Sequence, residues 1–196
     1  DGMLVSALDD IAWTLNLRGT DVHCNPVFVS YLLIESDKVS LFVDDNKLSP
    51  EVKQYLQDNQ VSLYNYNKVE KCLESYSEYN ILLDGDETSY YLWKTVKCQE
   101  IVAAASPIPA MKAVKNEAEI EGYRSAMLKD GVAMVKFLKW LKPAVEAGGQ
   151  TEISIDEKLT SLRAEQKLFR DISFDTIAGY AQHGAIVHYE ATPETD

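Results

Sequence analysis

Short apolar runs alternate with polar stretches and helical patterns over the first half of the chain. The runs 27–34 and 39–43 are rich in β-branched and aromatic residues, and a polar tetrapeptide separates them, so we predict a β-hairpin here. The same criteria predict strands at 61–64, 79–83 and 100–103, and helices at 50–59, 68–76 and 87–95. Strands that alternate with helices in this way indicate an α/β layer structure.

The character of the sequence changes at two closely spaced prolines, Pro107 and Pro109. Proline lacks a backbone N–H and restricts the residue before it, so this stretch disfavours both a helix interior and a central strand. We therefore predict a domain boundary here, with one domain at residues 1–108 and the start of a second at residues 109–196.

Beyond this boundary the apolar residues recur at helical spacing. Asn116 and Glu119 match a capping box, and the pattern predicts a helix of about 25 residues that Pro143 ends. The segments that follow predict a second helix at 151–167 and strands at 174–178 and 185–189. The second part therefore reads as two helices followed by two strands.

Charge and composition then narrow the class of protein. The chain carries 31 acidic and 19 basic residues, for a formal net charge of −12, and this balance argues against a nucleic-acid binder, which needs clustered Lys and Arg. No apolar run approaches the ~20 residues of a membrane-spanning helix, so we expect no membrane insertion. The three cysteines form no C-x-x-C pair, which favours buried, reduced thiols, and we expect a cytoplasmic protein.

Candidate chemistry is sparse, since H-E-x-x-H, G-x-S-x-G and P-loop patterns are absent from the sequence. The acidic tract 84–87 is typical of a strand-to-helix turn. His183 and His188 are five residues apart, which on one continuous strand puts them on opposite faces and disfavours a shared metal ion. A half-buried imidazole at His188 would suit proton transfer or carbonyl polarisation, and the alternative is a strand histidine bonded to a neighbour.

Several motifs, in order along the chain, resemble one family. The stretches LDDIAWTLNLRGTDV (8–22) and NPVF (25–28) are similar to the second, non-catalytic domain of the three-domain Xaa-Pro aminopeptidases, or aminopeptidase P, of peptidase family M24. Further matches to the catalytic "pita-bread" domain of that family lie at 113–119, 151–154, 171–177, 184–189 and 193–195. The resemblance implies an α/β fold class: a creatinase/prolidase N-terminal-type mixed-sheet domain, followed by a truncated α+β pita-bread domain.

The resemblance also implies an activity. Members of this family hydrolyse the bond between an N-terminal residue and a following proline, so peptides with proline at the second position are the expected substrates. The family uses two divalent metal ions, usually Mn²⁺, held by two Asp, one His and two Glu, and a homodimer is expected for the intact protein. In the family these ligands begin with an Asp-Gly-x-x-x-Asp pattern that follows the His-Tyr motif, which is His188-Tyr189 in this chain. We therefore expect all of them beyond Asp196 and no metal in this chain.

Only one catalytic position carries over by resemblance. His188 matches the family histidine that lines the active site and contacts the substrate or stabilises the transition state. His183 stands where the family often has Asn and receives no role, and Arg18, within the first motif, is expected to be structural.

An isolated chain without metal ligands would have no metal-bound nucleophile, so we expect it to be inactive. Half of a pita-bread domain would leave apolar surface uncovered, from which we expect self-association or a loosely held C-terminal part, with stability concentrated in residues 1–105. Two alternatives stay open: a prolidase- or creatinase-like hydrolase of the same fold, and a metal-free peptidase-like module that binds peptides or histones. The stretch 8–28 favours the aminopeptidases over the first, and His188 favours an enzyme over the second.

Overall fold

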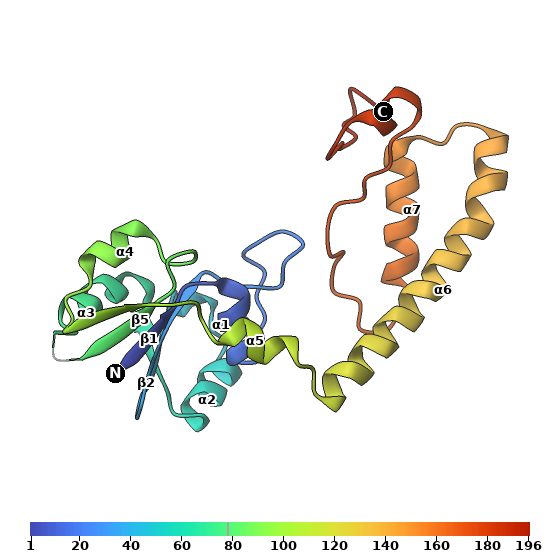
Figure 1. The fold of residues 1–196 in the computed structure, drawn as a ribbon. Coiled ribbons are helices and arrows are strands. Elements are labelled where there is room, and N and C mark those ends of the chain that lie inside the picture. The colour runs from blue at the N-terminus through green and yellow to red at the C-terminus, as the bar shows by residue number, and fades with distance from the viewer. Residues whose placement is uncertain (78) are drawn as a thin grey trace. The chain divides into compact units, whose positions relative to one another are not determined.

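The computed structural model describes residues 1–77 and 79–196 of the chain. Residues 1–114 form one compact unit and residues 115–196 form a second (Figure 1). The first unit contains a β-sheet covered by helices, whereas the second contains two helices and an irregular C-terminal segment.

A six-stranded mixed sheet, in the order β4-β3-β2-β1-β5-β6, forms the centre of the first unit. The strands are β1 (Gly2–Val5), β2 (Ser30–Glu35), β3 (Val39–Val43), β4 (Val61–Asn65), β5 (Asn80–Leu83) and β6 (Glu100–Ala103). β1 pairs antiparallel with β2 and parallel with β5, and the β2–β3 pair is antiparallel. The outer pairs, β3–β4 and β5–β6, are parallel. The predicted mixed sheet and the predicted hairpin are therefore both confirmed.

The described residues of this unit include the α-helices α1 (Leu8–Thr14), α2 (Pro50–Asp58), α3 (Val69–Glu74), α4 (Tyr90–Thr95) and α5 (Ile108–Ala113). Side-chain caps explain where two of them begin. Ser49 accepts a hydrogen bond from the backbone N–H of Val52 and so starts α2, as the sequence predicts. Ser89 accepts from the N–H of Leu92, which starts α4 at Tyr90, later than the predicted residue 87.

The sheet is covered on both faces, and the register of its strands shows why. Leu32 and Leu33 are neighbours in β2, yet they join different buried clusters, because successive side chains of a strand point to opposite faces. The cluster around Leu32 includes residues of α1, α2 and α5, and the cluster around Leu33 includes residues of α3 and α4. Burial on both faces accounts for strands that read as continuous apolar runs.

Helix α5 packs onto the first unit, although Pro107 is its N-cap residue and Pro109 lies in its first turn, at the two prolines that marked the predicted boundary. Ile108 is 4% exposed and belongs to the cluster around Leu32. The Lys112 ammonium lies 2.6 Å from the carboxylate of the buried Asp10 and also pairs with Asp9. The structure therefore divides the two units after Val114, and α5 is part of the first.

The second unit begins with α6 (Glu117–Ala147), a helix of 31 residues. The predicted capping box of Asn116 and Glu119 is confirmed, with both reciprocal hydrogen bonds present. The predicted end at Pro143 is wrong, because α6 continues through that residue. Proline removes one hydrogen bond of the helix, but the neighbouring bonds remain. The helix ends at Ala147, and the residue after it is Gly148, whose φ of +82° suits glycine.

Helix α7 (Glu152–Ala164) packs against α6 through a small apolar core. Its buried members are Ala133, Phe137, Leu159 and Leu162. Much of the remaining apolar surface of α6 is open, and Met127, for example, is 67% exposed. The core of the second unit is therefore much smaller than that of the first.

The two strands predicted at 174–178 and 185–189 are wrong. The structure describes both segments, and neither pairs with another strand. Between them lies one short 3-10 helix, η3 (Ala181–Ala185). A strand is stable only beside a hydrogen-bonded neighbour, and residues 115–196 contain none, so the apolar pattern alone does not produce a sheet here.

The cysteines and the helix lengths bear on the expected class of protein. Cys24, Cys72 and Cys98 are thiols outside any disulfide of the described residues, but each is half-buried rather than buried. Among the described helices, none combines the length and the apolar character needed to cross a bilayer.

We predict that Leu32→Ala lowers the free energy of unfolding of the first unit by about 2–5 kcal/mol, because Leu32 is fully buried in the central sheet and its loss leaves a cavity. A urea titration followed through amide signals of β2 and β3 measures this change. Met111→Ala, at an exposed position of α5, is the matched control and should shift the midpoint little. Equal midpoints for the two variants would contradict the proposed core.

Candidate functional site

The Glu152 carboxylate gathers the main polar cluster of the second unit. Glu152 is the first residue of α7 and is only 8% exposed. It accepts a hydrogen bond from the Tyr189 hydroxyl at 2.6 Å and another from the backbone N–H of Tyr180. The imidazole Nδ1 of His183 lies 3.0 Å from each carboxylate oxygen. One side chain thus connects the start of α7 to three residues of the C-terminal segment.

Local sequence explains why an acid stands at this position. Thr151 caps α7 by accepting from the N–H of Ser154, and the first turn of a helix favours negative charge. Burial of a carboxylate is costly unless donors replace the lost water, and here a hydroxyl, a backbone amide and an imidazole do so.

These contacts change the acid–base behaviour of the cluster. The hydrogen bond from Tyr189, helped by the Tyr180 amide and by His183, holds the pKa of Glu152 below its ordinary value, although burial opposes this shift. Burial and the hydrogen bond to Glu152 raise the pKa of Tyr189. Glu152 therefore remains a carboxylate, and Tyr189 remains a protonated donor, across the neutral range.

The rings and the chain end complete the cluster. The His183 and Tyr189 rings stack with their centroids 4.6 Å apart. The Tyr189 hydroxyl also lies 3.2 Å from the Thr195 hydroxyl, and the backbone N–H of Ile153 donates to a carboxylate oxygen of Asp196 at 3.0 Å. The residues that follow the His-Tyr motif therefore fold back onto the start of α7.

The predicted site residue His188 lies beside this cluster. Its side chain is exposed, and its imidazole is outside the contacts that Glu152 makes. Its backbone has a φ of +55°, in the left-handed region that non-glycine residues rarely adopt. The expectation of a half-buried strand histidine is therefore wrong. The hydrogen bond to Glu152 holds Tyr189 in a buried position, whereas the preceding His188 faces solvent.

Sequence reasoning gave no role to His183 and did not single out Glu152, yet the structure brings them together. They are 31 positions apart, and no local pattern connects them. The available signal was weak: an acid in a helix first turn and a histidine close to the His-Tyr motif.

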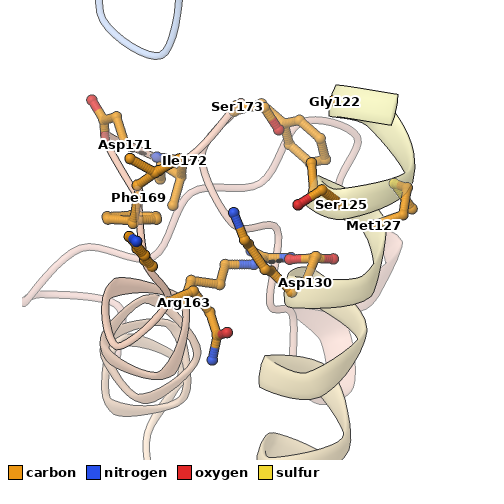
Figure 2. A pocket seen from close by; sticks show the side chains of 15 residues that line it. Gly122, Ser125, Met127, Asp130, Arg163, Phe169, Asp171, Ile172 and Ser173 are labelled. Atoms are coloured by element: carbon orange, nitrogen blue, oxygen red, sulfur yellow. Dashed lines mark hydrogen bonds and ion pairs between the residues drawn. The ribbon is translucent and has the colours of Figure 1, made fainter. Parts of the chain in front are cut away.

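A separate pocket of about 690 Å³ opens in the same unit (Figure 2). It lies between the first turns of α6 and the segment after α7. Arg163 of α7 points across to Asp130 of α6, with Nε 2.7 Å from the carboxylate oxygen, and this ion pair forms part of the lining. Phe169 and Ile172 lie across the pocket from Met127 of α6, so the lining combines apolar side chains with this ion pair.

Other candidate residues have structural roles. Asp84, in the acidic tract, accepts hydrogen bonds from the backbone N–H groups of Asp86 and Ser106, which confirms a turn. Arg18 donates to the carbonyl oxygens of Ala12 and Leu17 near the end of α1, as expected for a structural residue.

The second unit does not contain a metal centre of the kind the resemblance implies. Within residues 115–196, all of which the structure describes, no three His, Cys, Asp or Glu side chains converge closely enough to hold an ion. The oxygens of Glu152 already accept hydrogen bonds from protein donors. The residues present therefore do not form a dinuclear site.

Comparison with known families identifies the first unit. Residues 1–119 match the Creatinase/Prolidase N-terminal domain. The chain belongs to this family. Residues 121–196, which follow the creatinase/prolidase-type domain, match metallopeptidase family M24.

Individual relatives extend this comparison over the whole chain. The chain is 39% identical to Xaa-Pro aminopeptidase 1 of Dictyostelium discoideum and 36% identical to Xaa-Pro aminopeptidase ApepP of Drosophila melanogaster, and each alignment covers 100% of this chain. These alignments cover 32% and 33% of the two relatives. The chain therefore spans about a third of the length of the curated relatives it matches.

A solved structure gives the same result. The X-prolyl aminopeptidase of Caenorhabditis elegans, described as a cytosolic enzyme with a di-nuclear active site, is 30% identical, with a TM-score of 0.91. The match covers 100% of this chain and 33% of that one. The X-Pro aminopeptidase of Thermotoga maritima, at 17% identity and a TM-score of 0.56 over 84% of this chain and 46% of its own, shares the fold. The predicted fold class is confirmed.

We predict that the Glu152 cluster opens in acid. An unfolded glutamate has a pKa of ~4.3, and the folded pKa is lower, so the contribution of Glu152 to stability is complete above the unfolded value. That contribution is lost as the pH falls through the folded pKa. Tyr189, His183 and the nearby Asp196 are the other titratable groups that face this carboxylate or its partners.

An NMR titration from pH 7 to pH 3 measures this opening through the ring signals of Tyr189. We expect the stacking with His183 to disappear as the pH falls through the lowered pKa of Glu152, while the amide signals of β2 and β3 persist. Tyr189 signals that stay unchanged while the Glu152 carboxyl becomes protonated would contradict the prediction.

Proposed function

We propose that this chain is part of an Xaa-Pro aminopeptidase, which hydrolyses the bond between an N-terminal residue and a following proline. The observation that carries the proposal is the alignment of the entire chain, at 36–39% identity, with two proteins named Xaa-Pro aminopeptidases. The match to the C. elegans X-prolyl aminopeptidase, at a TM-score of 0.91, supports the same assignment.

Under this proposal the two parts of the chain have different tasks. We assign residues 1–108 to the non-catalytic domain and residues 109–196 to the start of the catalytic domain, and α5, which packs onto the first unit, lies across this boundary. The match of residues 121–196 to metallopeptidase family M24 supports the second assignment. His188 is the one residue of this chain that we place in the active site, where it contacts the substrate or stabilises the transition state.

The family resemblance supplies the metal part of the proposal. Two divalent metal ions, with Mn²⁺ as the proposed identity, would activate the water that attacks the scissile carbonyl. The di-nuclear active site described for the C. elegans enzyme supports the number of ions. The resemblance implies that the five ligands follow His188 and Tyr189, and we propose that they lie beyond Asp196.

The partners and location follow from the same assignment. Substrates are peptides with proline at the second position, and the intact enzyme is proposed to be a cytoplasmic homodimer. The cytosolic description of the C. elegans enzyme supports the location. The net charge of −12 supports a protein that binds neither nucleic acid nor an anionic membrane surface.

We predict that the isolated 196-residue chain, supplied with Mn²⁺, does not cleave an Xaa-Pro-Xaa tripeptide, because the proposed metal ligands are absent from it. The full-length protein that contains the chain should cleave the same peptide. Chromatography that detects release of the N-terminal amino acid measures both reactions. Turnover by the isolated chain would contradict the proposal. Full-length protein that cleaves only Xaa-Pro dipeptides would favour the prolidase-like alternative.

We also predict that His188→Ala in the full-length enzyme lowers kcat by about 100-fold, a typical loss for one transition-state hydrogen bond. Gln182→Ala, at an exposed position of the same segment, is the matched control and should retain normal turnover. Circular dichroism confirms that both variants are folded. An unchanged kcat for the His188 variant would remove this residue from the active site.

A further inference from the structure

One carboxylate holds both ends of the segment 180–189. Glu152 accepts from the backbone N–H of Tyr180 at the first end and from the Tyr189 hydroxyl, at 2.6 Å, at the second. His183 approaches the same carboxylate from within the segment. Tyr180 and Tyr189, the first and last residues of the segment, therefore both bind the Glu152 carboxylate. These two contacts close the segment into a compact loop.

Only the closing end of this loop is buried, because Glu152 holds Tyr180 through its backbone N–H while the Tyr180 side chain is 80% exposed. Tyr189 is 8% exposed, whereas Ile186 is 51% and Val187 is 81% exposed. His188 is also exposed and comes directly before the buried Tyr189. The direction in which the imidazole projects therefore depends on how firmly the ring of Tyr189 is held.

The backbone inside the loop is strained next to both anchors. Ala181 has a φ of +50° and His188 a φ of +55°. Ala181 directly follows Tyr180, and His188 directly precedes Tyr189. Left-handed conformations are unfavourable for side chains with a Cβ, and they persist where surrounding contacts over-determine them. The hydrogen bonds from Tyr180 and Tyr189 to Glu152 lie next to these two residues and can hold them in this conformation.

We propose that Glu152 is a positioning residue, which holds the loop 180–189 closed and so sets the direction in which His188 projects. This proposal rests on the role of His188 in the proposed function and extends it to a residue of α7. Glu152 acts through Tyr189 and His183 and does not itself contact the substrate. Loss of the carboxylate should free both ends of the loop while α7 remains folded.

The chain offers a matched control for this test. Glu117 is the first residue of α6, as Glu152 is of α7, and it is exposed. Glu152→Gln and Glu117→Gln each remove one charge from a helix first turn, but only the first removes it from the loop contacts. Tyr189→Phe is a second variant, which removes the hydroxyl and keeps the ring.

Amide hydrogen exchange and NMR of the full 196-residue chain measure closure of the loop. We expect Glu152→Gln and Tyr189→Phe each to speed exchange at the Tyr180 amide by about 10-fold or more, in line with the loss of a charge-assisted hydrogen bond. Glu152→Gln should also remove the ring contact between His183 and Tyr189. Exchange in both variants equal to that of Glu117→Gln would overturn the proposal.

Kinetics of the full-length enzyme test whether Glu152 acts through His188. We expect Glu152→Gln to lower kcat by about 10-fold with less effect on KM. The double variant with His188→Ala should be no slower than His188→Ala alone, because a positioning residue has no effect once its target is gone. A double variant whose loss of kcat equals the product of the losses in the two single variants would overturn the proposal. A full-length protein without Xaa-Pro cleavage would refute the proposed function, while amide exchange would still decide the role of Glu152.

Discussion

A carboxylate withdrawn from water must be matched by hydrogen-bond donors, and the second unit is organised by one such carboxylate. Glu152 stands where a helix cap and a helix dipole favour an acid, but its burial needs more donors than its own helix supplies. Tyr180, His183 and Tyr189 supply them. The irregular C-terminal segment therefore has a defined path without belonging to a sheet.

The first unit depends on a different constraint, which is burial of its sheet on both faces. Helices packed on opposite faces of β1, β2 and β3 give it two apolar clusters, while the second unit has one small cluster between α6 and α7. The second unit therefore buries fewer apolar side chains than the first, and polar contacts such as those of Glu152 have a larger part in its organisation.

Local signals predicted most of the elements correctly, because caps and hairpins involve residues close in sequence. Asn116 with Glu119 and Ser49 with Val52 are contacts over three residues. The strands expected at 174–178 and 185–189 failed because strand formation needs a partner that residues 115–196 do not provide. His183 was overlooked for a similar reason, since its partner Glu152 is 31 positions away.

The sequence by itself determined the fold class and the family resemblance, since these depend on patterns and motifs that can be read in order along the chain. It also pointed to His188, through the residues around it. Only the tertiary structure decided that His188 is exposed on a strained backbone and that Glu152 closes the loop beside it. These features depend on burial and on hydrogen bonds between distant residues, which exist only once the chain has folded.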